Sequence, residues 1–247
     1  MRARIRNPRG IKGEGTVEFR YRRQGERDKV FVKRFPLTGE PEQRVVFREG
    51  WSNPVLWDCE NPELYTQSVS LTVNGKKADA LPDADFGFRE MWVENGEFRL
   101  NGRKTRLRMW AHPAVERTSV FYGSGRGMAA YVAHAKEMNY DTVRFNPLEK
   151  SSERGFVPYL RESDRQGLSN LFPMPPYEGE DMALYREWVE RFLEHYGNHP
   201  SILMWYTDFN TCGYPWDQDP AKLTDTDYIP VSKRHARERA QVAEKVM

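Results

Sequence analysis

Polar and aromatic side chains follow four apolar runs in the second half of the chain, at the points where buried strands are expected to end. The carboxyl ends of parallel strands meet at one edge of a sheet, and active sites are built at that edge. We therefore expect these side chains to lie near one another. They are Trp110 and His112, Arg144 and Asn146, Asn170, and Asp208 and Asn210, with Tyr206 and Trp216 in the loop region.

Asp208 supplies the only carboxyl group on the last of these strand ends. Because side chains alternate along a strand, Asp208 and Asn210 share a face if the strand stays regular. A carboxyl group that keeps its proton can act as a general acid, whereas the amide of Asn210 cannot.

The sequence has no spacing of His, Cys, Asp and Glu that is typical of a metal site, and we expect no cofactor. The glycine-rich segment 123–127 precedes a helix but lacks the Lys-Ser/Thr pair of a phosphate-binding loop, so we interpret it as a loop. The two cysteines, Cys59 and Cys212, fall in different expected domains, and we expect no disulfide framework.

Strands and helices alternate from about residue 91 onward and must position these side chains. The patterns predict strands at 105–110, 141–146, 168–173 and 202–206, and helices at 126–139, 152–166, 181–196 and 231–246. Two helices carry expected apolar faces, formed by Met128, Val132, Ala135 and Met138, and by Leu184, Trp188, Val189, Phe192 and Leu193. Consecutive strand–helix units predict a parallel sheet with right-handed crossovers.

Residues 1 to about 90 alternate between apolar and polar side chains with the period of a β-strand. Val17, Phe19 and Tyr21 are one example, and they are expected to share the buried face of one strand. Several short strands of this kind, separated by Gly, Pro and Asn, predict an antiparallel sandwich. Trp57, Leu64 and Tyr65 lie in or beside a proline-containing bend and are expected to be core anchors.

Two stretches of the sequence resemble glycoside hydrolase family 2, the group of β-galactosidases, β-glucuronidases and β-mannosidases. The first contains FGFR at residues 86–89 and FRLNGRKTRLR at 98–108, and the second is NHPSILMW at 198–205. In that family such motifs close an immunoglobulin-like sandwich, open a (β/α)8 barrel and form the strand that ends in the catalytic acid. The resemblance implies an immunoglobulin-like β-sandwich over residues 1–90 and the first four βα units of a TIM barrel over residues 91–247.

The resemblance also implies hydrolysis of β-glycosidic bonds with retention, by an acid and a nucleophile about 5–5.5 Å apart. The family's acid is the Glu of an Asn-Glu pair five residues after the strand's Trp. That pair falls here on Phe209 and Asn210, so Asn210 holds the acid position without a carboxyl group. Asp208 is the candidate substitute. The family's nucleophile lies on a seventh strand, beyond the four expected here.

Arg144 matches the family's second-strand arginine, which implies that it lies near the catalytic carboxylates and the substrate and keeps those carboxylates ionised and in position. A structural salt bridge to an Asp or Glu is the alternative. His112 matches the family's first-strand histidine, which implies a place beside the substrate, and a capped histidine in the loop is the alternative. Trp110, Tyr206 and Trp216 offer aromatic rings that can stack on a sugar or pack in the interior. Asn146 completes the expected substrate-binding set.

Charge and hydropathy argue against several classes of partner. The 247 residues hold 38 Lys and Arg against 36 Asp and Glu, so we expect neither nucleic acid nor an anionic membrane as partner. The first third is rich in Arg, which we interpret as a solvated β-surface. No apolar segment approaches the ~20 residues of a membrane span. Residues 1–6 lack the apolar core of a secretory signal. The expected partner is a carbohydrate.

Four βα units are half of the eight that close a barrel. We therefore expect the chain to be part of a longer enzyme and to be inactive alone, with a dimer of half barrels or a compact open sheet as alternatives. Two other functions stay open. The missing Asn-Glu pair suggests a non-catalytic carbohydrate-binding or scaffold protein. An inverting or water-assisted enzyme could instead use Asp208 with a distant base.

Overall fold

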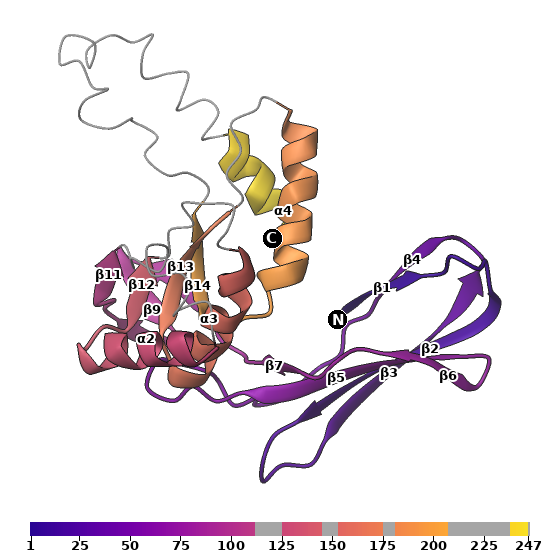
Figure 1. Cartoon of the computed structure of the whole chain (residues 1–247), viewed down its shortest axis with the longest axis horizontal. Coiled ribbons are helices and arrows are strands. Elements are labelled where there is room, and N and C mark those ends of the chain that lie inside the picture. The colour runs from indigo at the N-terminus through magenta and orange to yellow at the C-terminus, as the bar shows by residue number, and fades with distance from the viewer. Residues whose placement is uncertain (112–124, 145–152, 175–180, 207–237, 247) are drawn as a thin grey trace. The chain divides into compact units, whose positions relative to one another are not determined.

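A computed structural model describes residues 1–111, 125–144, 153–174, 181–206 and 238–246 of the chain (Figure 1). The chain divides into two compact units, one of residues 1–57 and 63–88 and the other of residues 58–62 and 89–247. The first unit contains only β-strands and loops, and the second combines two sheets with helices.

Two antiparallel sheets form the first unit. The larger sheet has the order β3 (Lys29–Thr38), β2 (Lys12–Arg22), β5 (Tyr65–Val73) and β6 (Lys76–Ala80), and β7 (Ala84–Phe86) also pairs with β5. The smaller sheet consists of β1 (Arg2–Arg6) and β4 (Glu42–Val46), which run antiparallel to each other.

The core of the first unit lies between these sheets. Val17, Phe19 and Tyr21 of β2 are buried, as their alternation predicts, and they share one apolar cluster with Ile5 of β1 and Val45 of β4. Trp57 and Tyr65 are also buried, and the Tyr65 hydroxyl accepts a hydrogen bond of 2.8 Å from the backbone N–H of Val55. Two of the three predicted core anchors are therefore confirmed, whereas Leu64 is only partly buried.

A three-stranded antiparallel sheet opens the second unit. Its order is β10 (Arg103–Thr105), β9 (Glu97–Leu100) and β8 (Met91–Glu94). Two Asn-Gly turns connect these strands, at residues 95–96 and 101–102, and all four residues have positive φ angles. This is the conformation that the Asn-Gly sequence predicts for tight hairpins.

A four-stranded parallel sheet follows, and its strands lie side by side in chain order (Figure 1). The strands are β11 (Met109–Ala111), β12 (Thr142–Arg144), β13 (Ser169–Pro173) and β14 (Ile202–Tyr206). The helices between or after them are α2 (Gly125–Glu137), α3 (Glu153–Gln166), α4 (Met182–Tyr196) and a helix of residues 238–246.

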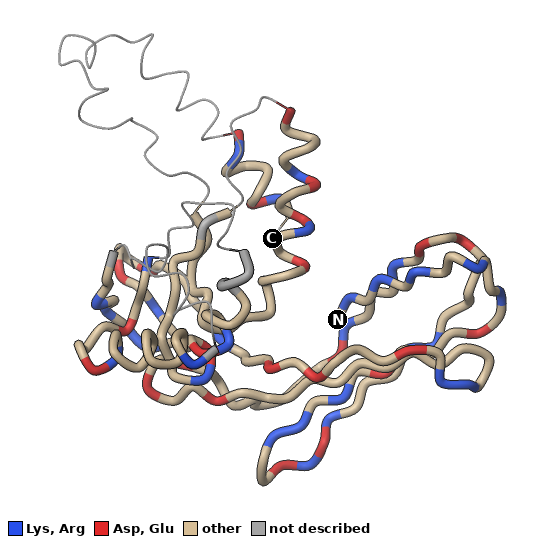
Figure 2. Tube along the Cα trace, in the orientation of Figure 1, with Lys and Arg blue, Asp and Glu red and all other residues tan. Residues whose placement is uncertain are grey.

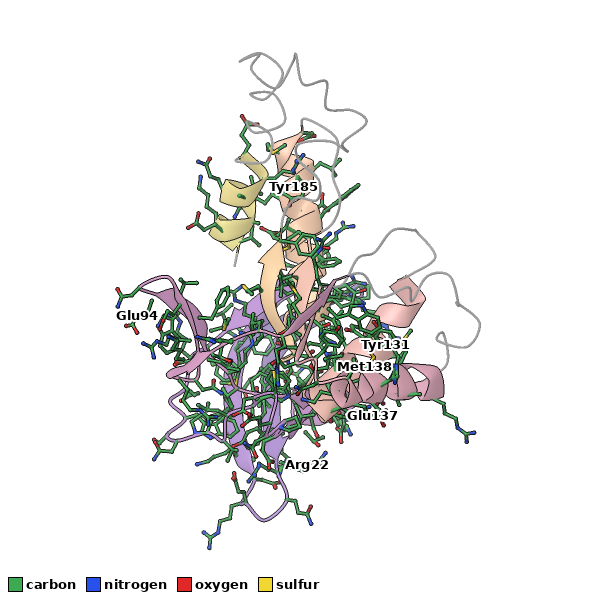
Figure 3. All side chains as sticks on the ribbon, turned by 90° about the vertical axis from the view of Figure 1, so that its left-hand side faces the viewer. Arg22, Glu94, Tyr131, Glu137, Met138 and Tyr185 are labelled. Atoms are coloured by element: carbon green, nitrogen blue, oxygen red, sulfur yellow. The ribbon has the colours of Figure 1, made fainter. Side chains whose placement is uncertain are left out.

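Helices cover one face of this parallel sheet with apolar side chains. Val143, Phe172 and Ile202 of three neighbouring strands share a buried cluster with Val132 of α2 and Leu160 of α3. A second cluster joins α4 to the helix of residues 238–246 and includes Tyr185, Val189 and Ala243. Figure 3 shows Tyr185 on α4 beside that last helix. None of the described helices is long and apolar enough to cross a membrane.

The expected strand of residues 105–110 is divided in two, which corrects the sequence-based expectation. Thr105 ends β10 and Met109 begins β11. The first piece pairs antiparallel with β9 and the second pairs parallel with β12, so one straight strand cannot serve both sheets. Between them, the Arg108 backbone N–H and side chain bind the Asp141 carboxylate at 2.7 and 2.9 Å and fix the change of direction.

Three residues expected on apolar helix faces are instead exposed. Met138 is 47% exposed because α2 ends at Glu137, and Figure 3 shows both residues at that end of the helix. Leu184 and Trp188 of α4 are 39% and 40% exposed, whereas the buried residues of this helix are Tyr185, Val189 and Tyr196. The buried stripe of α4 is therefore rotated relative to the expected one.

Candidate active site

The carboxyl edge of the parallel sheet brings strand ends into register. Arg144 ends β12 and lies opposite Ala111 of β11 and Leu171 of β13. Tyr206 ends β14 and lies opposite Pro173 of β13. The backbone N–H of Met174 donates a hydrogen bond of 2.8 Å to the Tyr206 carbonyl, which extends the pairing of β13 and β14 to this edge.

Arg144 and Tyr206 meet across the intervening strand β13. The Arg144 guanidinium donates a hydrogen bond to the Tyr206 phenol oxygen. Their neighbours Val143 and Trp205 pack with the helices, and side chains alternate along a strand, so Arg144 and Tyr206 belong to the opposite face of the sheet. The structure thus joins two of the residues singled out in the sequence, from the second and fourth strands.

Burial and charge act in opposite directions on the phenol of Tyr206. Desolvation of the partly buried ring raises its pKa, and the hydrogen bond and positive charge of Arg144 lower it. Burial prevails, and the Tyr206 pKa is raised to about 12. The phenol is therefore neutral at physiological pH and keeps a proton to donate, beside a guanidinium that stays charged. Together they can bind hydroxyl and carboxylate oxygens.

We predict that Tyr206 is among the last tyrosines of the chain to ionise. An alkaline titration followed at 295 nm should lose a transition centred near pH 12 when Tyr206 is replaced by Phe. The raised pKa of Tyr206 also makes the folding stability fall at high pH. Above pH 10 the unfolded chain loses this proton before the folded chain does, so the contribution of Tyr206 to stability is complete below pH 10 and is lost as the pH rises through 12. A Tyr206→Phe chain with an unchanged titration would contradict the assignment.

Aromatic packing accounts for both tryptophans on these strands. The Trp110 ring stacks with Tyr131 and Tyr140, at centroid distances of 5.6 and 5.7 Å. Trp205 meets Phe172 edge-on at 5.8 Å and packs against both apolar clusters of the second unit. Both tryptophans therefore also serve the packing between the sheet and its helices.

Asn170 lies inside β13 rather than at its end, so the expectation that it belongs to the active edge is wrong. Its side chain is fully buried, with the carboxamide oxygen accepting a 2.6 Å hydrogen bond from the Tyr159 hydroxyl and the amide donating to the Leu168 carbonyl at 3.1 Å. Arg144 lies opposite Leu171 and Tyr206 lies opposite Pro173, so the carboxyl edge lies beyond Asn170.

Five of the singled-out residues lie outside the described part of the chain. They are His112, Asn146, Asp208, Asn210 and Trp216. Among the described residues, no group of three or more His, Cys, Asp or Glu side chains could hold a metal ion.

A buried polar network at the opposite end of β14 was not anticipated from the sequence. Arg89 donates to the backbone carbonyls of Pro200, at 3.0 Å, and of Ile202. Asp164 of α3 accepts a 3.0 Å bond from the Ser201 N–H and contacts His199 Nδ1 at 2.5 Å. Burial lowers the pKa of Arg89, and the negative charge of Asp164 opposes that shift.

This network joins the FGFR and NHPSI motifs through Arg89, which is 111 residues from Pro200. It fixes the amino end of the strand whose carboxyl end carries Tyr206. The sequence contains both motifs, but their separation along the chain does not show that Arg89 contacts the second motif.

Comparisons with a family model and with known proteins point to the same family. Residues 1–89 match the sequence model of the family described as "Glycosyl hydrolases family 2". A β-galactosidase of Pectobacterium atrosepticum is 28% identical over 194 residues, which cover 73% of this chain and 18% of that protein. A β-galactosidase of Thermoanaerobacterium thermosulfurigenes is 27% identical over 209 residues, covering 79% of this chain and 28% of that protein.

The fold is shared with a crystal structure of a glycosyl hydrolase family 2 member from Bacteroides cellulosilyticus. That likeness has a TM-score of 0.71 at 19% identity and covers 100% of this chain and 32% of the other. The chain thus spans less than a third of the length of each of these three relatives. The resemblance that the two sequence motifs indicate is confirmed, and the chain is a relative of the glycosyl hydrolases of family 2.

Proposed function

We propose that the chain provides an immunoglobulin-like sandwich, residues 1–90, and the first four βα units of a TIM barrel, residues 91–247, to a retaining β-glycosidase. The observation that carries this proposal is the parallel sheet β11–β12–β13–β14, in which Arg144 and Tyr206 meet at the carboxyl edge. In a barrel of this kind the substrate binds at that edge.

Each side chain at this edge has a chemical role in the proposed reaction. Arg144 stays charged and favours the ionised form of a nearby carboxylate, as the nucleophile requires. Asp208 is the proposed general acid, which needs apolar or negatively charged surroundings to keep its proton near neutral pH. Tyr206 holds the Arg144 guanidinium and keeps a hydroxyl proton for a sugar oxygen.

The remaining proposed contacts to the substrate come from the neighbouring strand ends. His112 and Asn146 would hydrogen-bond sugar hydroxyls, and Trp216 would offer a ring face to the C–H face of a sugar. Trp110 lies opposite Val143 on the face that the helices cover, so we propose a packing role for it rather than a sugar contact. Asn210 takes the position of the family's acid and would bind rather than protonate.

The test uses the longest reading frame that contains this chain, assayed on 4-nitrophenyl and alkyl β-glycosides. Asp208→Asn is expected to lower kcat at least about 100-fold, which is the lower end of what a general acid contributes. The loss should be larger for the alkyl glycosides, because nitrophenolate leaves readily without a proton. Asp181→Asn, a change of the same kind in the N-cap of α4, is the matched control and should keep nearly full activity.

Full activity of Asp208→Asn on both substrate classes would remove Asp208 from the mechanism.

Proton NMR of the first product formed decides between retention and inversion. Inversion would favour the variant in which Asp208 works with a distant base, whose carboxyl groups lie about 6.5–9.5 Å apart.

A second candidate function is carbohydrate binding without catalysis. The replacement of the family's Asn-Glu pair by Phe209 and Asn210 is the observation in its favour. Calorimetric binding of a sugar by the same protein, with no turnover across the glycoside panel, would support it. A fold can persist after its chemistry is lost, so the assay and not the architecture decides.

A further inference from the structure

The outward face of the smaller sheet in the first unit is strongly basic. In the two strands β1 and β4, the buried side chains include Ile5 and Val45, and the alternate positions point outward and are exposed. The six outward side chains are four arginines, one glutamate and one valine: Arg2, Arg4, Arg6, Arg44, Glu42 and Val46. We call this set the arginine face. Figure 2 shows Lys and Arg recurring along these strands.

The strand register places like charges opposite each other on the arginine face. Arg4 lies directly across from Arg44, an arrangement that destabilises an antiparallel pair. Glu42 is the one acidic residue among the six, and its carboxylate contacts Arg4 at 3.6 Å. A surface that keeps four cations around one anion is therefore suited to bind an anionic partner.

The excess of positive charge is local to the first unit. That unit contains sixteen Lys and Arg against eleven Asp and Glu, whereas the rest of the chain has a small negative excess. The near-neutral total of +2 hides this separation. A charge pattern of this kind attracts a polyanion to one unit without attracting it to the whole chain.

We propose that the arginine face binds an anionic polysaccharide whose repeating charge is a carboxylate. Outward residues along one strand are ~6.8 Å apart, so Arg2, Arg4 and Arg6 form a straight row of cations that an extended polymer can follow. The guanidinium group is planar and pairs with carboxylates through two parallel hydrogen bonds. The choice of a carbohydrate polymer rests on the proposed glycosidase function.

The composition of the arginine face argues against nucleic acid as its partner. Single-stranded nucleic acids are held by aromatic side chains that stack on the bases, in addition to cations. None of the six outward residues of β1 and β4 is aromatic. Instead, Phe19, Tyr21 and Phe47 of the first unit are turned into its core. The surface therefore provides charge without a platform for bases.

Binding of the full chain to polygalacturonate tests the proposal, with neutral dextran of similar length as the reference polymer. Calorimetry or affinity electrophoresis should show binding to polygalacturonate only, and the binding should weaken as salt is raised. The double variant Arg4→Gln/Arg44→Gln should bind at least about fivefold more weakly, since each exposed ion pair contributes modestly. Lys76→Gln/Lys77→Gln removes the same charge from the exposed strand β6 and should change the affinity less than about twofold.

Several results would overturn the proposal. They are no binding to polygalacturonate at low salt, equal losses in the two double variants, or binding of single-stranded DNA that is as tight and as dependent on Arg4 and Arg44. Circular dichroism of both variants confirms that the fold is kept. Because binding requires no turnover, a negative result here leaves hydrolysis of β-glycosides untouched, and a glycosidase assay without turnover leaves the binding result standing.

Discussion

Replacing Asp164 by Ala should destabilise the second unit by about 3–5 kcal/mol, the cost of breaking a buried charged network by removing one partner. Asp164 is 1% exposed, accepts the Ser201 N–H and contacts His199. Its loss leaves the backbone N–H of Ser201 without this acceptor and removes the negative charge that acts on the partly buried Arg89. Urea unfolding followed by circular dichroism measures the change.

Hydrogen exchange identifies where the Asp164→Ala chain opens. Faster exchange is expected in α3 and at the start of β14, and unchanged exchange in β2 and β5 of the first unit. Glu187→Ala is the matched control, because Glu187 pairs with Arg191 on the exposed side of α4 and its loss should cost no more than about 0.5 kcal/mol.

The conservative variant Asp164→Asn separates charge from hydrogen bonding. It retains an oxygen that can accept the Ser201 N–H but lacks the charge opposite Arg89, so an intermediate loss is expected. If Asp164→Ala and Glu187→Ala cost the same, the network does not hold β14 and the role assigned to Asp164 is wrong.

Local patterns in the sequence correctly predicted the elements whose conformation depends on residues nearby in the chain. The strand at residues 202–206 and the buried set Val17, Phe19 and Tyr21 follow from apolar runs and alternation alone. Asp181 was expected to begin a helix, and its carboxylate accepts the N–H groups of Ala183 and Leu184 as an N-cap does. In each case the determining contacts lie within a few residues.

Long-range contacts explain what the patterns missed. Arg108 divides the expected strand of residues 105–110 because it binds Asp141, which is 33 residues away. Trp188 was expected to be buried, but which face of α4 packs depends on the sheet and on the helix of residues 238–246. A helical period identifies an amphipathic face only to within one or two positions.

The candidate site was predictable as a set of residues but not as a geometry. Arg144 was singled out at the end of an apolar run and Tyr206 in the loop region after another, whereas their hydrogen bond depends on the order of three strands. Asn170 was misplaced because the apolar run continues past it to Pro173, and its side chain is buried against Tyr159 of α3. Parallel order and register are properties of the assembled sheet, and single-strand patterns do not contain them.

Gly167 is the position where a single methyl group should have a large effect. Gly167 has a φ of +74°, and a Cβ atom built there would overlap the carbonyl oxygen of Cys59. The Lys136 ammonium donates to the carbonyls of both Cys59, at 2.7 Å, and Gly167, at 3.0 Å, so the segment of residues 58–62 cannot move away without losing these bonds. Both the backbone strain and the overlap therefore oppose an alanine.

Gly167→Ala should accordingly cost about 3 kcal/mol or more, of which the left-handed backbone alone accounts for about 1–2 kcal/mol. Gly102→Ala measures that backbone part by itself, because Gly102 has a φ of +80° and no atom within 4 Å of an added Cβ. The difference between the two variants in urea unfolding therefore isolates the contact with Cys59.

The thiol of Cys59 gives a second and independent measure of that contact. Burial raises the pKa of the Cys59 thiol, so its reaction with a disulfide reagent should be slow in the parent chain. In a Cys212→Ser background, Gly167→Ala should speed this reaction because the segment of residues 58–62 is displaced, and Gly102→Ala should leave it unchanged. Equal stabilities and equal labelling rates for the two alanine variants would show that residues 58–62 do not pack against Gly167.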